Sequence, residues 1–150
     1  MAPLERTKAL AYITHSNSLL ILKHPDHPEA GIQVPAGSVE FGESPRSGAL
    51  REAFEETGLR NLRLVRFLGL VRFDRLPIDH VPGFHNRWFF HLACDEKPAE
   101  VWQHYEMTPS DGTAPVCFEF SWVELDRVVL DCGHDAMLDR LRQSLDTVHL

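Results

Sequence analysis

The sequence contains little cysteine and lacks any long apolar run. Three cysteines among 150 residues are too few for a disulfide framework, and no Cys/His spacing is typical of structural zinc. We therefore expect Cys94, Cys117 and Cys132 to be free thiols in the core of a protein from a reducing compartment. No segment approaches the ~20 apolar residues that a membrane-spanning helix requires, and the amino terminus lacks the apolar stretch of a signal peptide. These absences predict a cytoplasmic protein that does not enter a membrane.

Basic residues are also scarce relative to acidic ones. The 15 Lys and Arg residues against 22 Asp and Glu residues give a formal net charge of −7, which repels an extended phosphate backbone. We therefore expect no extended nucleic acid among the partners. A small phosphorylated ligand is compatible with this charge, because a bound divalent cation reverses the local field. The length and the 43% hydrophobic fraction are typical of one domain with a substantial core, which we assign to residues 1–150.

The hydrophobic periodicity predicts strands first, then a helix, then further strands and a last helix. Period-2 and continuous apolar runs favour strands, whereas apolar residues three and four apart favour helices. The expected strands cover 9–13, 19–22, 32–34, 62–73, 87–94, 101–105 and 116–123, the last helix covers 135–145, and long loops cover 77–86 and 108–115. This order predicts an α+β fold in which helices pack on a mixed sheet.

The first helix carries clear signals at both ends. Ser44 is expected to be its N-cap, Pro45 its first residue and Gly58 the residue that ends it. Four apolar residues form a stripe that we expect to face the core: Ala49, Leu50, Ala53 and Phe54.

Three glutamates gather on the other side of this helix. At ~100° of turn per residue, Glu52, Glu55 and Glu56 lie within about a third of the circumference. Like charges at this spacing destabilise a helix by ~0.2–0.5 kcal/mol per pair, so a compensating cation is expected. Mg²⁺ or Mn²⁺, which bind oxygen ligands, fit best. The alternative is a solvated acidic face, but Gly37 and Gly42 in the preceding loop favour the metal site.

Together these residues resemble the signature of the Nudix hydrolases, G-x5-E-x7-R-E-U-x-E-E-x-G-U, where U is apolar. The resemblance is sharp over residues 32–59, and Ala53 is a departure from the larger aliphatic residue usual at its position. It implies a Nudix-like α/β/α sandwich with a mixed sheet, the signature loop and helix, and a C-terminal helix. The fixed positions are filled by Gly37, Glu43, Arg51, Glu52, Glu55, Glu56, Gly58 and Leu59.

The resemblance implies a hydrolase that cleaves the pyrophosphate bond of a nucleoside diphosphate linked to another moiety. Substrates of this class are nucleoside triphosphates, nucleotide sugars and dinucleoside polyphosphates. Mg²⁺ or Mn²⁺ would be bound by Glu52, Glu55 and Glu56, together with the backbone carbonyl of Gly37. The partner is therefore expected to be a small nucleoside diphosphate derivative. A homodimer is compatible with the resemblance, since dimers are common in the family.

The catalytic residues implied by the resemblance are Glu55, Glu52, Arg51 and a carboxylate outside the signature. Arg51 has two interpretations: it orients a catalytic glutamate through an ion pair that also involves Glu43, or it contacts phosphate directly. The general base is either a glutamate of the signature helix or a later carboxylate. Glu119 is the first choice for that later carboxylate.

Other features leave alternatives open. Glu106 is the second choice for the outlying carboxylate, and Trp102 is the aromatic residue that we most expect to stack on a nucleobase. Neither a proline nor a tyrosine at the family's substrate-marking positions is clearly present. Two rival functions are a catalytically silent Nudix-like domain that binds a nucleotide and regulates another protein, and a structural protein with a solvent-facing acidic helix.

Overall fold

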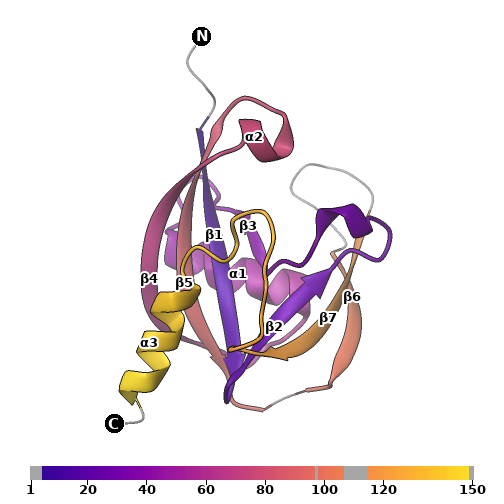
Figure 1. Ribbon diagram of the computed structural model, residues 1–150, viewed down its shortest axis with the longest axis vertical. Coiled ribbons are helices and arrows are strands. Elements are labelled where there is room, and N and C mark those ends of the chain that lie inside the picture. The colour runs from indigo at the N-terminus through magenta and orange to yellow at the C-terminus, as the bar shows by residue number, and fades with distance from the viewer. Residues whose placement is uncertain (1–4, 97, 107–114, 149–150) are drawn as a thin grey trace.

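The computed structural model describes residues 5–96, 98–106 and 115–148 of the chain (Figure 1). Within them, seven strands form one sheet in the order β4-β5-β1-β2-β7-β6, and β3 pairs with β1. The strands are β1 (Glu5–His15), β2 (Ser18–Lys23), β3 (Ala36–Ser38), β4 (Leu62–Asp74), β5 (Phe84–Cys94), β6 (Val101–Glu106) and β7 (Val116–Glu124). The helices are a 3-10 turn (Pro28–Ala30), α1 (Pro45–Thr57), α2 (Leu76–Asp79) and α3 (Leu138–Val148).

The sheet is mixed, and helices cover both of its faces. β1 and β5 run parallel, whereas the other strand pairs are antiparallel. Ala49 and Ala53 of α1 belong to the core on one face, and Leu138 and Leu141 of α3 belong to the core on the other (Figure 1). The expected α+β fold with a mixed sheet is therefore confirmed.

Helix α1 begins and ends where the sequence predicts. The Ser44 hydroxyl accepts a hydrogen bond from the Ser47 N–H at 3.1 Å. At the other end Gly58 has φ +77°, and its N–H donates to the Phe54 carbonyl at 2.8 Å. Both signals are local in sequence, which is why they locate the helix without tertiary information.

The packing face of α1 differs from the expected stripe. Ala53 is fully buried against the sheet, so the small residue at this signature position lets the helix approach the strands closely. Phe54 is 44% exposed, and the Arg60 guanidinium lies 5.7 Å from its ring centroid. The expectation that Phe54 faces the core is wrong, because Glu52 and Glu56 occupy buried positions on the helix instead.

Several boundaries are also corrected. The strand expected at 32–34 lies at Ala36–Ser38, and Gln33 forms only an isolated bridge with Leu22. The long loop expected at 77–86 contains most of α2 and the start of β5, and the last helix begins at Leu138 rather than at residue 135. Pairing with β1 and β4 decides the bounds of β3 and β5, and pairing is invisible in the local sequence. Most of the loop expected at 108–115 lies outside the described residues.

Strands β1 and β2 pair only beside their hairpin, at Thr14↔Leu19 and His15↔Ser18. Towards its start, β1 pairs with β3 instead, over residues 8–10 and 36–38. Ala9 of β1 packs in the core beneath α1, whereas Leu10 packs in the core beneath α3. Strand β3 therefore has one side towards α1 and one side towards the opposite face of the sheet.

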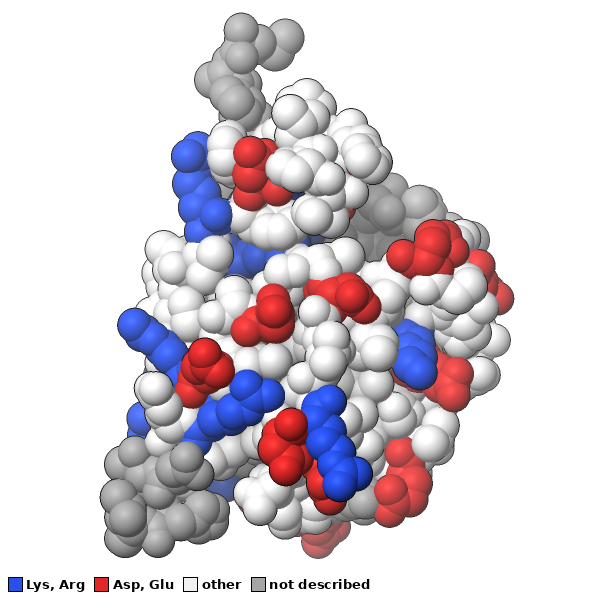
Figure 2. Space-filling model, viewed as in Figure 1, with Lys and Arg blue, Asp and Glu red and all other residues white. Residues whose placement is uncertain are grey.

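Two of the three cysteines lie in the core as expected, whereas Cys132 does not. Cys94, Cys117 and Cys132 are free, the first two buried and the third half-buried. In the part of the chain that the structure describes, no helix is long and apolar enough to cross a membrane. On the face drawn in Figure 2, Lys and Arg are interspersed with Asp and Glu rather than gathered in one broad patch.

Candidate metal centre

The carboxylate of Glu52 packs directly on Gly37 of β3. A Cβ atom at position 37 would lie 2.0 Å from the Glu52 Cδ and 2.2 Å from its Oε2, which no real contact allows. A glycine is therefore required here by the close approach of the glutamate to the strand, not by backbone conformation. Helix α1 and strand β3 therefore pack against each other through the Glu52 carboxylate and Gly37.

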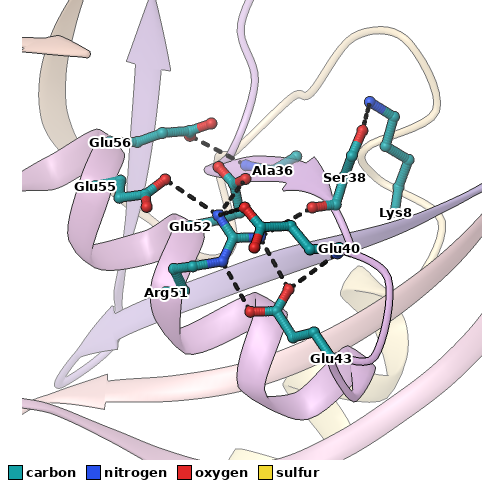
Figure 3. Close-up of polar contacts among 9 residues, drawn as sticks. All are labelled: Lys8, Ala36, Ser38, Glu40, Glu43, Arg51, Glu52, Glu55 and Glu56. Atoms are coloured by element: carbon teal, nitrogen blue, oxygen red, sulfur yellow. Dashed lines mark hydrogen bonds and ion pairs between the residues drawn. The ribbon is translucent and has the colours of Figure 1, made fainter. Parts of the chain in front are cut away.

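Glu56, one turn after Glu52, is buried beside the same strand. Its Oε2 accepts a hydrogen bond from the Ala36 N–H at 3.1 Å (Figure 3). Burial raises the pKa of Glu56 well above its ordinary value, and the charges of Glu52 and Glu106 act in the same direction. Burial likewise raises the pKa of Glu52 to about 7, against the opposing effect of the Arg51 guanidinium.

Arg51 holds the acidic groups around the loop and the helix together (Figure 3). Its Nε and Nη2 donate to the two oxygens of Glu43 at 2.8 and 2.9 Å, and these bonds hold the pKa of Glu43 below its ordinary value. Nη1 donates to Glu52 at 2.9 Å and to Glu55 at 3.1 Å, and Nη2 also donates to the Ser38 carbonyl at 3.0 Å.

These five bonds use all five N–H donors of the guanidinium. An arginine with no donor left is not arranged to bind a phosphate, so the geometry favours the interpretation in which Arg51 orients the glutamates through an ion pair with Glu43. The network also fixes the loop that precedes α1, because the Glu40 N–H donates to Glu43 at 3.1 Å.

Three carboxylates from two elements converge at this position. One oxygen each of Glu52, Glu55 and Glu106 lie within 4.8 Å of one another. Glu52 is buried, Glu106 is half-buried and Glu55 is exposed, so the group opens to solvent on one side. Glu106 comes from β6, far from the signature in sequence.

Strand β6 is held against the end of α1 by two hydrogen bonds. The indole N–H of Trp102 donates to the Thr57 carbonyl at 3.1 Å, and Nε2 of His104 is 3.1 Å from the Glu55 carbonyl. Glu106 follows on the same face of the strand, because side chains two residues apart point the same way. The bonds made by Trp102 and His104 therefore bring Glu106 to the glutamates of α1.

The residues expected outside the signature are placed differently. Glu119 alternates with Phe118 and Phe120, which pack beneath α1, so its side chain lies on the opposite face of β7. Trp102, expected to stack on a nucleobase, is half-buried and stacks on Phe120 with ring centroids 5.2 Å apart. The period-2 pattern predicts which residues share a face, but only the packing of α1 decides which face carries the site.

The donor set fits a hard divalent cation. Four carboxylates (Glu52, Glu55, Glu56 and Glu106) influence one another electrostatically, and Arg51 is the cation bonded to two of them. Concentrating negative charge in a partly buried site is unfavourable unless cations bind there. Oxygen ligands alone, without sulfur or imidazole in the group of three, are the ligands that Mg²⁺ and Mn²⁺ prefer.

Comparison with known proteins agrees with this geometry. A family model described as the NUDIX domain matches residues 4–143. An RNA pyrophosphohydrolase of Yersinia pestis (strain Pestoides F) is 35% identical over 112 residues, which cover 65% of this chain and 59% of the relative. An RNA pyrophosphohydrolase of Yersinia pseudotuberculosis (serotype O:3, strain YPIII) matches to the same extent. The chain thus spans less than two thirds of the length of these relatives.

Solved structures share the fold at low sequence identity. A MutT protein from Methanosarcina mazei Go1 superposes with a TM-score of 0.66 at 18% identity, covering 96% of this chain and 97% of that one. A UDP-X diphosphatase superposes with a TM-score of 0.62 at 16% identity, covering 100% of this chain and 66% of that one. At such identities the likeness concerns the arrangement of the sheet and helices.

Proposed function

Since the chain belongs to the NUDIX family, we propose that it is a divalent-metal-dependent hydrolase of the pyrophosphate bond in nucleoside diphosphate derivatives. The observation that carries this proposal is the convergence of Glu52, Glu55 and Glu106 beside the buried Glu56. A solvated acidic face would leave all the glutamates of α1 in water, whereas Glu52 and Glu56 are each only 5% exposed. The complete set of carboxylates also weighs against a catalytically silent relative.

The ligands of the cation in this proposal are Glu52, Glu55 and Glu106, with Glu56 and the Gly37 carbonyl beside them. When bound, Mg²⁺ or Mn²⁺ would neutralise the diphosphate and lower the pKa of a bound water. Arg51 keeps the carboxylates of Glu52 and Glu55 in place through its hydrogen bonds, so it is a positioning residue. A carboxylate of the same group takes the proton of the attacking water, and Glu106 replaces Glu119 as our choice for the carboxylate outside the signature.

The substrate is proposed only as a class. The candidate substrates are nucleoside triphosphates, nucleotide sugars and dinucleoside polyphosphates, all of which contain the bond that this site is suited to cleave. A second candidate is the pyrophosphate end of an RNA, which is favoured by the 35% identity to enzymes named RNA pyrophosphohydrolases. Only an end of the RNA would enter the site, consistent with the acidic net charge of −7.

The proposal is tested by phosphate and pyrophosphate release from a panel of these substrates, including an RNA with a 5′-triphosphate, with and without Mg²⁺ or Mn²⁺. We expect metal-dependent turnover that falls by at least ~10²-fold in Glu55→Gln, since this near-isosteric change removes a charged ligand. Absence of turnover with every substrate would favour the silent nucleotide-binding domain.

The role of the carboxylate outside the signature is tested in the same assay with Glu106→Gln and Glu119→Gln as a matched pair. Both changes preserve shape and remove one charge, from opposite faces of the β6–β7 pair. We expect a large loss of turnover only in Glu106→Gln. A loss confined to Glu119→Gln would return the role to Glu119.

A further inference from the structure

A second cavity, of about 200 Å³, lies on the side of β3 that faces away from α1. Ala36 and Gly37 of β3 are among its lining residues, so the cavity and the candidate metal centre share this strand. Its charged and titratable lining side chains are Lys8, Asp79, His85, Arg87, Cys132 and His134. Basic groups therefore gather behind the strand whose other side carries the acidic ones.

Arg87 is the most unusual residue of this lining, because it is only 7% exposed. Its Nη1 donates to the Cys132 carbonyl at 2.6 Å, and its guanidinium lies 3.6 Å from the centroid of the Phe73 ring. Among the ion pairs of the described residues, none involves Arg87. A buried guanidinium normally pairs with a carboxylate, and here its remaining donors border a cavity instead.

Lys8 lies directly beside Arg87. The two residues are register partners in the parallel β1–β5 pair, and both line the same cavity. The Lys8 ammonium donates to the Ser38 hydroxyl at 2.9 Å (Figure 3). Burial lowers the pKa of Lys8, and the charges of Arg6 and Arg87 add to this effect. Two like charges side by side in a sheet are destabilising, so an anion between them would relieve the repulsion.

The other titratable lining groups form no ion pair with Lys8 or Arg87 among the described residues. The Asp79 carboxylate pairs with Nε of Arg75 at 3.0 Å. Burial lowers the pKa of His85 to about 4 and that of His134 to about 3, so both imidazoles are neutral at pH 7. His134 also accepts the Val34 N–H at 3.1 Å. The cavity thus presents donors on Lys8 and Arg87, and Asp79 is the one carboxylate among its lining residues, where it also acts electrostatically on Arg87.

These features fit a phosphoryl group better than a nucleobase. No Phe, Tyr or Trp side chain is among the described residues that line the cavity, whose rings are the imidazoles of His85 and His134. The volume is below the roughly 300–1,000 Å³ of pockets for drug-sized ligands, which suits one small anionic group. Arginine and lysine side by side are the residues that bind phosphate oxygens most strongly.

We propose that this cavity binds a phosphoryl group of the substrate other than the scissile diphosphate, and that Arg87 and Lys8 determine the preference for substrates that carry this additional group. This inference rests on the proposed function, because it assumes that the diphosphate lies at the glutamates on the other side of β3. The expected substrates are therefore nucleoside diphosphate derivatives that carry an additional phosphate.

The experiment measures binding to the metal-free protein, which requires neither turnover nor a cation. The probes are two pyrophosphate-linked dinucleotides that differ by one ribose phosphate, NADPH and NADH, and calorimetric titration gives the two dissociation constants. We expect the phosphorylated compound to bind at least about 10-fold more tightly, as one charge-assisted hydrogen bond would give. The ratio of the two dissociation constants should fall to near one in Arg87→Met, which keeps an unbranched apolar stem and removes the guanidinium with its charge.

Two further variants keep the test decisive. Lys8→Met removes the second cation and applies if Arg87→Met does not fold. Arg127→Gln, an exposed arginine paired with Glu124 outside the cavity, is the matched control and should keep the full ratio. Equal or undetectable binding of both compounds to the wild type, or a ratio unchanged in both Arg87→Met and Lys8→Met, would overturn the proposal.

A separate titration with inorganic phosphate distinguishes the source of the anion. Arg87-dependent binding of free phosphate, together with equal binding of NADPH and NADH, would mean that the cavity takes a free anion, and the assignment to the substrate would be overturned. Failure of the hydrolysis assay with a preserved NADPH preference would instead overturn the proposed function alone.

Discussion

At the scale of single residues, burial controls the charge of the candidate metal centre. Glu52 and Glu56 lie one turn apart and are almost inaccessible to water. In the folded protein the ionised form of each therefore lacks the hydration that it has in the unfolded chain. Arg51 offsets this loss at Glu52, whereas Glu56 receives one backbone N–H bond, from Ala36. The raised pKa values follow from this imbalance and give a measurable dependence of stability on pH.

We expect the raised pKa values of Glu52 and Glu56 to make folding of the metal-free protein less favourable as the pH rises from about 4.5 towards 7. The lowered pKa values of the buried His85, His91 and His134 act in the opposite sense below pH 6.5, so the carboxyl contribution is measured as a difference between the wild type and a variant that keeps these histidines. An acid whose pKa is higher in the folded than in the unfolded state contributes its stability below the unfolded value and loses it as the pH passes the folded value. For Glu52 this window runs from 4.5 to about 7. The contribution of Glu52 to the free energy of unfolding should fall on the order of 2 kcal/mol across it.

Glu56→Gln is the control for this prediction, since it removes one of the two raised carboxyls. In urea denaturation, the stability of the variant relative to that of the wild type should increase over the same pH range, and saturating Mn²⁺ should reduce the unfavourable carboxyl contribution in the wild type. Identical pH profiles for the metal-free wild type and Glu56→Gln would contradict the assignment of a raised pKa to Glu56.

At the scale of elements, the contact between α1 and β3 brings the signature residues together. The helix itself is predictable, because Ser44, Pro45 and Gly58 act within a few residues of its ends. Its depth against the sheet is not, since it depends on Gly37 and Ala53 meeting side chains from other elements. Gly37, the glycine at the start of the signature, permits this close contact because it has no side chain.

Gly37→Ala should therefore displace the Glu52 carboxylate. The added Cβ would overlap Cδ of Glu52 at 2.0 Å, so the end of this side chain must move away from the strand. We expect weaker Mn²⁺ binding by calorimetry, turnover lower by at least ~10-fold, and a loss of stability of ~1–3 kcal/mol.

Gly42→Ala is the matched control for this substitution. No atom lies within 4 Å of the added Cβ, but φ is +81°, so the change strains the backbone without touching Glu52. It should lower stability by ~1 kcal/mol and leave the affinity for Mn²⁺ near that of the wild type. Equal Mn²⁺ affinity in Gly37→Ala and Gly42→Ala would refute the packing argument.

At the scale of the whole molecule, Tyr12 ties the centre of the sheet to the segment before α3. Its side chain is fully buried, its hydroxyl donates to the His134 carbonyl, and the Met137 N–H donates to that hydroxyl at 3.2 Å. Burial raises the pKa of Tyr12, so the hydroxyl stays protonated and keeps its donor role. The segment held in this way contributes Cys132 and His134 to the cavity that Lys8 and Arg87 also line.

Tyr12→Phe should lower the free energy of unfolding by ~1–3 kcal/mol, because it leaves a buried carbonyl and a backbone N–H without their partner. Urea denaturation measures the change. Tyr105→Phe removes the same hydroxyl from a residue that is 53% exposed and should stay within ~0.5 kcal/mol of the wild type. Equal effects of the two substitutions would show that the link through Tyr12 does not stabilise the fold.

The sequence by itself determined the family, the position of α1 and the three glutamates of the helix. All of these depend on residue types at fixed, short spacing, which helix geometry converts directly into neighbours in space. Even the mixed sheet followed from the order of strands and helices.

Only the tertiary structure decided the rest of the site. Glu106 joins the glutamates because Trp102 and His104 hold β6 to the end of α1, and neither bond is visible in the local sequence. Lys8 and Arg87 are 79 positions apart and become neighbours only when β1 and β5 pair in parallel. Strand pairing joins distant segments, so spacing along the chain carries no record of it.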